Sequence, residues 1–134
     1  MKGSYIVVIE LTTDKKINVG KLGKICFKPG LYFYVGSALN GLEQRINRHI
    51  RNEKKVHWHI DYLLEYGKII EVYYKEGTSK DECKISRNLA EVFQSIQEFG
   101  CSDCKCSSHL YYGSKNDFIK NINKMNFKKY SISQ

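Results

Sequence analysis

The order of strand-like and helix-like segments is the feature that most limits how this chain can fold. Residues 4–11 and 31–35 are rich in the aliphatic and aromatic side chains that strands bury, and the first of these segments predicts a largely buried strand. Between them, residues 17–27 place two glycines among branched side chains, which predicts a strand, a turn and a second strand. The triplet at residues 36–38 (GSA) is expected to break the strand before it.

Helical spacing of apolar side chains becomes the dominant pattern only later in the chain. Helices are predicted over residues 41–52, 56–66 and 79–99 and from residue 116 onward, and a strand over residues 69–74. The third helix is expected to bury Val92 and Phe93, and the fourth to bury Ile119. Strands that come first, followed mostly by helices, are typical of an α+β fold. We therefore predict one domain over residues 1–134, with a small, mainly antiparallel central sheet flanked by helices.

The charge of the chain favours a polyanionic partner. It carries 22 basic and 14 acidic residues, which gives a formal net charge of +8. Such an excess attracts nucleic acid or an anionic membrane. The early apolar run at residues 6–9 is far too short to span a bilayer or to act as a signal segment. We therefore expect nucleic acid rather than a membrane as the partner, and a cytoplasmic location.

Two tyrosine motifs accompany the predicted early strands. Residues 3–5 (GSY) open the first strand, and residues 34–36 (YVG) lie where an aromatic strand ends shortly before a helix. This pair resembles the GIY and YIG motifs of the GIY-YIG nuclease family. The resemblance extends to Arg45, which matches the catalytic arginine of that family, and to Glu82, which matches its metal-binding glutamate.

The match is closer still to a small prokaryotic branch of that family whose function is mostly unknown. That branch carries the blocks YVGSA, GLxxRIxRH, HWHIDYLL, EC and FGCSDCxCxSHL. The same blocks stand here at residues 34–38, 41–49, 57–64, 82–83 and 99–110, so the resemblance covers most of the chain. It implies a GIY-YIG-like α+β fold and metal-dependent hydrolysis of a phosphodiester.

The resemblance assigns a chemical role to each motif residue. Cleavage needs a nucleophilic water, a Lewis acid and a group that neutralises charge in the transition state. Glu82 would hold Mg²⁺ or Mn²⁺, since a hard cation accepts a single carboxylate with waters and phosphate around it. Arg45 would grip the scissile phosphate. Tyr5 or Tyr34 would deprotonate the water, and the choice between them stays open; His49, one helical turn beyond Arg45, would touch the phosphate or relay a proton.

Two departures from the family pattern bear on this hypothesis. Tyr5 and Tyr34 lie much further apart than the motif tyrosines of the shorter family members, and the gap requires an inserted hairpin at residues 12–27. Some relatives carry Lys after the glycine of the second motif, where this chain has Ser37. The change removes one phosphate contact and weakens the expected catalysis.

Nucleic-acid contacts are expected around the second motif and along a basic run that begins inside the candidate site. The expected contact residues are Gly36, Ser37, Arg48, Arg51, Lys54 and Lys55. A charge run is usually a solvated face, but the starting point of this one favours phosphate binding. A second basic run, from Lys115 to Lys129, is equally consistent with a solvated face and with phosphate contacts.

His57 and Asp61 lie four residues apart and therefore share one face of the second predicted helix. They could contact a metal or a second phosphate, or they could form an ordinary hydrogen bond while Trp58 packs in the core. We favour the structural role, and Asp61 is the first member of the block to test.

Four soft metal ligands lie close together in the sequence: Cys101, Cys104, Cys106 and His109. The chain has five cysteines, so they cannot all pair internally, and crowded thiols in a reducing cytoplasm indicate metal binding or free thiols. Tetrahedral Zn²⁺ is one interpretation, although ligation from one tight loop is strained. The equally weighted alternative is a loop at residues 100–110 whose small side chains hydrogen-bond its own backbone.

The motifs together favour a DNA endonuclease that uses one divalent metal ion. No module for reading bases is visible, so a flapped, branched or damaged substrate in DNA repair is expected rather than a defined sequence. The alternative from another class is a catalytically silent, zinc-stabilised nucleic-acid-binding module that acts as an adaptor to a repair protein. An RNA-directed nuclease is a third hypothesis.

Overall fold

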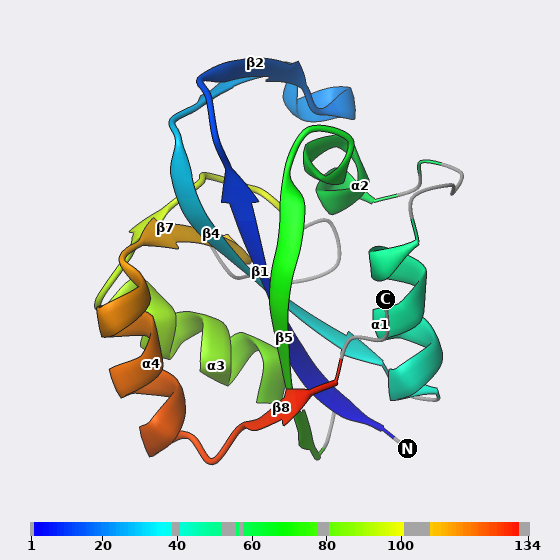
Figure 1. The fold of residues 1–134 in the computed structure, drawn as a ribbon, viewed down its shortest axis with the longest axis vertical. Coiled ribbons are helices and arrows are strands. Elements are labelled where there is room, and N and C mark those ends of the chain that lie inside the picture. The colour runs from blue at the N-terminus through cyan, green and yellow to red at the C-terminus, as the bar shows by residue number, and fades with distance from the viewer. Residues whose placement is uncertain are drawn as a thin grey trace.

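The computed structural model describes residues 2–38, 41–51, 56, 58–77, 81–100 and 108–131. Within these residues a six-stranded antiparallel sheet forms the centre, and helices cover both of its faces (Figure 1). The predicted α+β class is therefore confirmed. No helix in this part of the chain is long and apolar enough to cross a bilayer.

The strands of the sheet lie in the order β6-β7-β4-β1-β5-β8. Their bounds are β1 Gly3–Leu11, β4 Gly30–Ala38, β5 Lys68–Glu76, β6 Gln94–Ser95, β7 Leu110–Gly113 and β8 Lys128–Tyr130. The helices are α1 Leu42–Ile50, α2 His59–Leu64, α3 Asp81–Ala90 and α4 Lys115–Lys124. A separate two-stranded sheet pairs β2 Lys15–Asn18 with β3 Lys24–Phe27, which are joined through the 3-10 turn η1 Gly20–Leu22.

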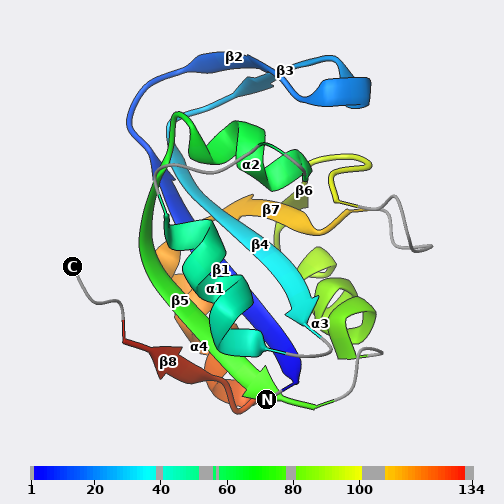
Figure 2. The same ribbon diagram turned by 90° about the vertical axis from the view of Figure 1, so that its right-hand side faces the viewer.

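Strand β1 separates two hydrophobic cores because its side chains alternate between the faces of the sheet. Tyr5, Val7 and Ile9 enter the core shared with α1, α2 and the β2–β3 hairpin. Ile6 and Val8 enter the core shared with α3 and α4. Figure 2 shows α1 and α2 together on one side of the sheet. Since α4 packs on the other face, its lysines do not continue the basic run of α1. Strand β8 does reach α1, because the hydroxyl of Tyr130 donates a hydrogen bond to Oδ1 of Asn47.

The predicted hairpin between the two tyrosine motifs is confirmed. Its apolar residues Ile17 and Phe27 are buried in the same core as α2, so the insertion folds onto the domain instead of separating β1 from β4. The two long strands pair directly, with Val7 opposite Tyr34 and Tyr5 opposite Gly36. Tyr5 and Tyr34 therefore project from neighbouring strands on the same face of the sheet.

The prediction that residues 36–38 break the second motif's strand is wrong, because β4 continues to Ala38. Gly36 has a different reason for being glycine. The ring of Tyr5 lies against it, and a Cβ at Gly36 would stand 2.3 Å from the ring carbon Cζ of Tyr5. Glycine thus allows the close approach of a ring to the backbone rather than ending the strand.

The third helix is shorter than predicted and ends at Ala90. The next residues turn so that Phe93 is buried against Phe33, while Val92 is 49% exposed, which corrects its predicted burial. Gln94 and Ser95 then pair with β7 as the edge strand β6. Sheet hydrogen bonds and the burial of Phe93 outweigh the helical spacing of this stretch.

Three smaller predictions are corrected, two of them at the ends of helices, and one strand was not predicted. The second helix covers only His59–Leu64. The fourth helix begins at Lys115, after Ser114, whose side chain accepts a hydrogen bond from the backbone N–H of Asp117 as a helix cap. Ile119 on that helix is 37% exposed rather than buried. Strand β8, which the sequence did not indicate, pairs with β5 at the edge of the sheet.

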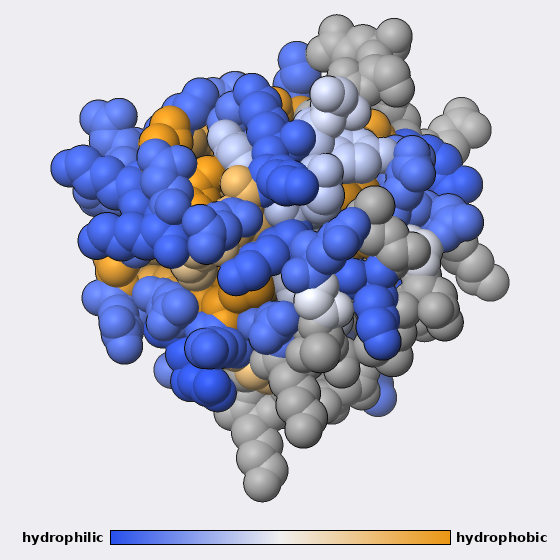
Figure 3. Space-filling view, turned by 90° about the horizontal axis from the view of Figure 1, so that it is seen from below, coloured by the Kyte–Doolittle hydropathy of each residue, from blue (hydrophilic) through white to orange (hydrophobic). Residues whose placement is uncertain are grey.

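The surface at the lower end of the molecule is mainly hydrophilic. Among the residues that Figure 3 draws in colour, most side chains at this end are hydrophilic, and apolar residues are visible in areas between them. Scattered apolar atoms commonly remain exposed on the surface of folded proteins.

Glu71 on β5 ties α4 and β8 to the sheet. One carboxylate oxygen lies 3.4 Å from Nζ of Lys115 and the other 3.0 Å from Nζ of Lys129. Burial alone would raise the pKa of Glu71, but the two lysines outweigh it and hold the pKa below its ordinary value. The lysine side chains are 50% and 64% exposed, so solvent screens both pairs.

We expect Glu71→Gln to lower the free energy of unfolding at neutral pH by about 1 kcal/mol or less. A lowered carboxyl pKa stabilises the fold fully above the pKa of the unfolded chain, which is about 4.3, and the contribution disappears as the pH falls through the folded pKa. Urea unfolding of both proteins at several pH values measures the difference. A difference that grows toward acid pH would contradict this assignment, and exposed Glu65→Gln is the matched control.

Candidate active site

The two motif tyrosines lie side by side beneath the candidate site. Tyr5 on β1 is 2% exposed and Tyr34 on β4 is 8% exposed. Tyr34 packs edge-on against His49 and Phe99. The pairing of β1 with β4 places both rings on the face covered by α1, as the register requires.

Helix α1 supplies Arg45 and His49, one turn apart on the face that meets the tyrosines. The helix begins after Gly41, whose φ of 70° is a left-handed conformation that favours glycine. His49 is buried, and its Nε2 lies 2.7 Å from the hydroxyl of Tyr5 in a hydrogen bond. His49 therefore contacts a motif tyrosine directly and has little access to solvent.

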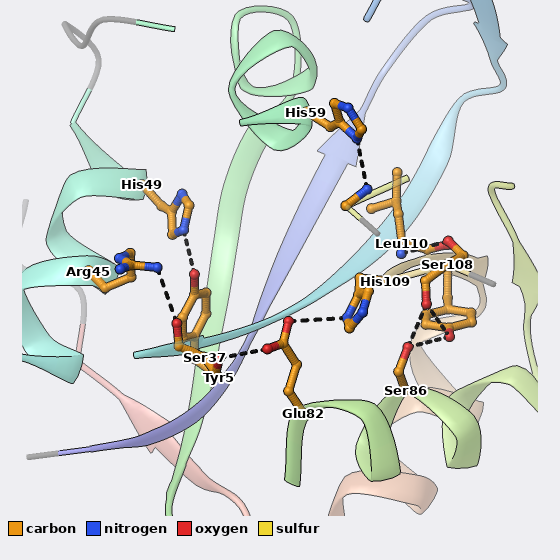
Figure 4. Close-up of polar contacts among 12 residues, drawn as sticks. Tyr5, Ser37, Arg45, His49, His59, Glu82, Ser86, Ser108, His109 and Leu110 are labelled. Carbon is orange, nitrogen blue, oxygen red and sulfur yellow. Dashed lines mark hydrogen bonds and ion pairs between the residues drawn. The ribbon is translucent and has the colours of Figure 1, made fainter. Parts of the chain in front are cut away.

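A continuous chain of polar contacts joins Arg45 to Glu82 (Figure 4). Nη1 of Arg45 donates to the carbonyl oxygen of Ser37 at 3.2 Å. The hydroxyl of Ser37 donates to Oε2 of Glu82 at 2.6 Å. Glu82 lies in the first turn of α3, on the far side of β4 from α1. The strand end that carries Ser37 thus connects the guanidinium and the carboxylate.

His109 completes this chain, in a position that the sequence did not suggest. Its Nδ1 lies 3.2 Å from Oε1 of Glu82, and the residue is buried. Backbone hydrogen bonds fix it, because its N–H donates to Phe99 and its carbonyl accepts from Val35. The sequence gave zinc ligation by His109 and three cysteines as one of two equally weighted interpretations. The structure instead aims it at Glu82, and Cys101, Cys104 and Cys106 lie outside the described residues.

Burial and the charge of Arg45 have opposite effects on the pKa values of the two tyrosines, and burial is the larger effect for both. Burial raises the pKa of Tyr5 well above its ordinary value, while the neighbouring Arg45 lowers it. Burial also raises the pKa of Tyr34, and the charge of Glu82 adds to the effect. Burial lowers the pKa of His109, against the raising effect of Glu82. Both phenols are therefore protonated at neutral pH in this arrangement.

The predicted nucleic-acid contacts are only partly available. Ser37 directs its hydroxyl to Glu82, and the Tyr5 ring covers Gly36. Arg48 forms a two-pronged ion pair with the buried Asp61, at 3.0 Å for each oxygen. Arg51, just after α1, is exposed. Lys54, Lys55 and His57 lie outside the described residues.

The structure gives Asp61 the structural role that was favoured for it. Its side chain has no exposed area. Besides Arg48, Asp61 accepts a hydrogen bond at 2.9 Å from the backbone N–H of Trp58, which caps the start of α2. A buried carboxylate with an arginine and a backbone donor is satisfied within the protein, so no metal or phosphate is needed to explain it.

Glu82 can accept a hard divalent cation. Its side chain is 24% exposed, and Ser37 and His109 each face one of its two oxygens. An ionised carboxylate has about four acceptor positions, so coordination sites remain. Among the described residues, His, Cys, Asp and Glu form no group of three that could hold a metal. This donor set fits Mg²⁺ or Mn²⁺, which bind through one or two carboxylates together with waters and phosphate.

Comparison with known proteins gives a family but no activity. The family model described as a domain of unknown function, DUF123, matches residues 4–131. No curated protein and no solved structure matches the chain. The geometry of the site therefore has to carry the functional argument.

Proposed function

We propose that this chain, which belongs to the DUF123 family, hydrolyses phosphodiesters in nucleic acid with one divalent metal ion. The observation that carries the proposal is the contact chain from Arg45 through Ser37 to Glu82. Strand β4 and helix α1, which follow each other, and the distant helix α3 contribute to it. A positively charged group for the phosphate and a carboxylate for the metal ion are what a metal-assisted phosphodiesterase requires. The resemblance of the tyrosine motifs to those of GIY-YIG nucleases supports the same reaction.

Arg45 would bind the phosphate and neutralise the charge that develops in the transition state. A guanidinium has five N–H donors in a rigid fork, and the Ser37 carbonyl holds Nη1. Its remaining donors can engage phosphate oxygens in two-pronged geometry. The anchoring carbonyl limits the loss of side-chain freedom when the phosphate binds.

Glu82 would hold the metal ion, with Ser37 and His109 orienting its carboxylate from either side. When bound, the cation supplies Lewis acidity to the phosphate and lowers the pKa of a water. Hydrogen bonds to a metal-binding carboxylate fix its orientation, and such contacts commonly tune metal affinity. The hydroxyl of Ser37, in the place where some relatives carry Lys, would thus act on the metal ligand instead of on the phosphate.

Tyr5 is the stronger candidate for proton transfer. Its hydroxyl is hydrogen-bonded to Nε2 of His49, which can accept or return a proton. Its raised pKa keeps the phenol protonated, so proton transfer requires positive charge close by. Arg45 already supplies part of that charge, and a cation on Glu82 would add to it. Tyr34 would then shape the site from beneath.

A DNA substrate with a branch, flap or lesion is the favoured class. The net charge of +8 and the exposed Arg51 favour phosphate contacts without base readout. One observation favours the silent nucleic-acid-binding adaptor instead, namely the burial that raises the pKa of both tyrosines. RNA as the substrate is tested in the same assay.

The test is single-turnover cleavage with Mn²⁺ of labelled flapped, branched and single-stranded DNA and of matched RNA. We expect the wild-type protein to cut at least one DNA substrate, and Arg45→Ala to cut it about 10²- to 10³-fold more slowly. The matched control is Arg87→Ala, an exposed helical arginine on α3, which should stay within about twofold. Binding without cleavage by the wild-type protein would favour the silent adaptor.

A further inference from the structure

We infer that Trp58 is a positioning residue that holds Arg45 in the orientation needed to bind phosphate. The inference rests on the proposed function and extends it to a residue that makes no contact with the reacting atoms. The sequence suggested only that Trp58 packs in the core. Its contacts place it at the start of α2, against the face of α1 that carries Arg45 and His49.

One indole contacts both site residues of α1. Cζ of Arg45 lies 4.5 Å from the centroid of the Trp58 ring. The ring of His49, one turn further along the helix, lies 5.7 Å from the same indole, centroid to centroid. His49 in turn is bonded to Tyr5. A displacement of Trp58 would therefore remove support from Arg45 and from the partner of Tyr5 at the same time.

Asp61 holds Trp58 in two ways, directly through its backbone N–H and indirectly through Arg48. The carboxylate accepts the backbone N–H of Trp58 at 2.9 Å, which fixes the residue at the start of α2. It also binds Arg48 through both oxygens, and Cζ of Arg48 lies 4.2 Å from the indole centroid. We call this set of contacts the Trp58 frame: Asp61 binds Arg48 and the backbone of Trp58, and the indole of Trp58 in turn lies against Arg45.

The Trp58 frame restricts the side-chain freedom of Arg45. The carbonyl of Ser37 fixes only one nitrogen of its guanidinium. An arginine on a flexible stem loses side-chain freedom when it binds phosphate, and an aromatic face beneath the guanidinium restricts that freedom in advance. Stacking leaves the edge donors of the fork available for the phosphate. Trp58 therefore supplies a restraint on the plane of the guanidinium that the hydrogen bond to Ser37 does not.

A base-stacking role explains the contacts less well. Tryptophan on a nucleic-acid-binding surface commonly stacks on a base. Here two guanidinium groups already lie over the indole. Because two guanidinium groups already occupy positions over the partly buried ring, the indole serves the arginines rather than a nucleobase.

A double-mutant cycle on DNA binding tests the inference. The proteins are wild type, Trp58→Leu, Arg45→Ala and the double variant, titrated with a labelled flapped duplex in EDTA so that binding is measured without cleavage. We expect Trp58→Leu to weaken binding about threefold to tenfold when Arg45 is present, and by less than about twofold when Arg45 is absent. Equal fold losses in both backgrounds would overturn the inference.

A second variant covers the case in which Trp58→Leu fails to fold. Trp58→Phe keeps an aromatic face of smaller size, so we expect normal thermal melting and a smaller loss of binding. That loss must also disappear in the Arg45→Ala background. Exposed Tyr66→Leu, an aromatic substitution in the turn just after α2, is the control and should leave binding unchanged. A loss with Trp58→Phe that persists without Arg45 would overturn the inference.

The outcomes separate this inference from the proposed activity. Coupling between Trp58 and Arg45 in binding, with no cleavage by the wild-type protein, would support the frame and reject the nuclease. Cleavage by the wild-type protein with independent effects of the two substitutions would reject the frame and leave the nuclease standing. Where cleavage occurs, the same cycle on the single-turnover rate gives a second, independent measure of coupling.

Discussion

We expect that replacing Glu82 with Gln abolishes metal-stimulated cleavage while the protein stays folded and binds DNA. The amide keeps the size of the carboxylate and an oxygen that can accept from Ser37, but it lacks the negative charge that a hard cation requires. We expect the single-turnover rate with Mn²⁺ to fall by about 10³-fold or more, which corresponds to about 4 kcal/mol of lost transition-state stabilisation. Binding measured in EDTA should stay within about twofold of wild type, because it depends on the basic residues.

The comparison needs a control that changes the charge equally elsewhere. Glu91→Gln serves this purpose, since Glu91 follows α3 and is exposed. It should cut DNA at the wild-type rate. Cleavage by Glu82→Gln at the rate of Glu91→Gln would show that Glu82 does not hold the metal, even if the protein is a nuclease.

Asp61→Asn should be the most destabilising of the substitutions considered. The buried carboxylate binds Arg48 through both oxygens and also caps α2. Removing one member of a buried ion pair typically costs about 3–5 kcal/mol, because the other charge is left without its partner. Arg48 is 19% exposed and can partly regain water, so we expect a loss of about 3 kcal/mol in the free energy of unfolding. Urea unfolding monitored by circular dichroism measures it.

The Asp61 prediction has its own control and a clear contrary outcome. Asp14→Asn changes an exposed residue before β2 and should shift stability by less than about 0.5 kcal/mol. Combining Asp61→Asn with Arg48→Gln should cost less than the sum of the single effects, because the stranded charge is gone. A loss with Asp61→Asn as small as that of Asp14→Asn would mean that the ion pair does not hold α1 to α2.

The central strands were predictable because continuous runs of apolar residues in the sequence indicate their burial. The strand at Gly3–Leu11 has apolar residues on both faces, as a strand covered on both sides requires. The hairpin was predictable from its two glycines. By contrast, the end of α3 depends on β6 pairing with β7, whose residues come later in the chain. Strand β8 likewise exists because β5 offers it a free edge. No local pattern carries such information.

The candidate site likewise contains residues that motifs identify and contacts that only the fold creates. Tyr5, Arg45 and Glu82 were identified from motif and order, and the structure joins Arg45 to Glu82 through Ser37 and places His49 against Tyr5. The contact of His109 with Glu82 was missed because the three cysteines at residues 101, 104 and 106 suggested a metal-binding group within one loop, whereas Glu82 lies far away in sequence. The stacking of Trp58 on Arg45 joins two helices and was equally invisible. The closeness of Trp58 to Asp61 in sequence indicated a contact between these two residues, but nothing in the sequence indicated the stacking on Arg45.

The most direct measurement is cleavage of a flapped DNA duplex by excess wild-type protein, followed over time with Mn²⁺ and with EDTA. The account predicts a first-order loss of intact strand with Mn²⁺ and none with EDTA. A duplex that is fully bound at every protein concentration tested, yet stays intact with both Mg²⁺ and Mn²⁺, would contradict the account.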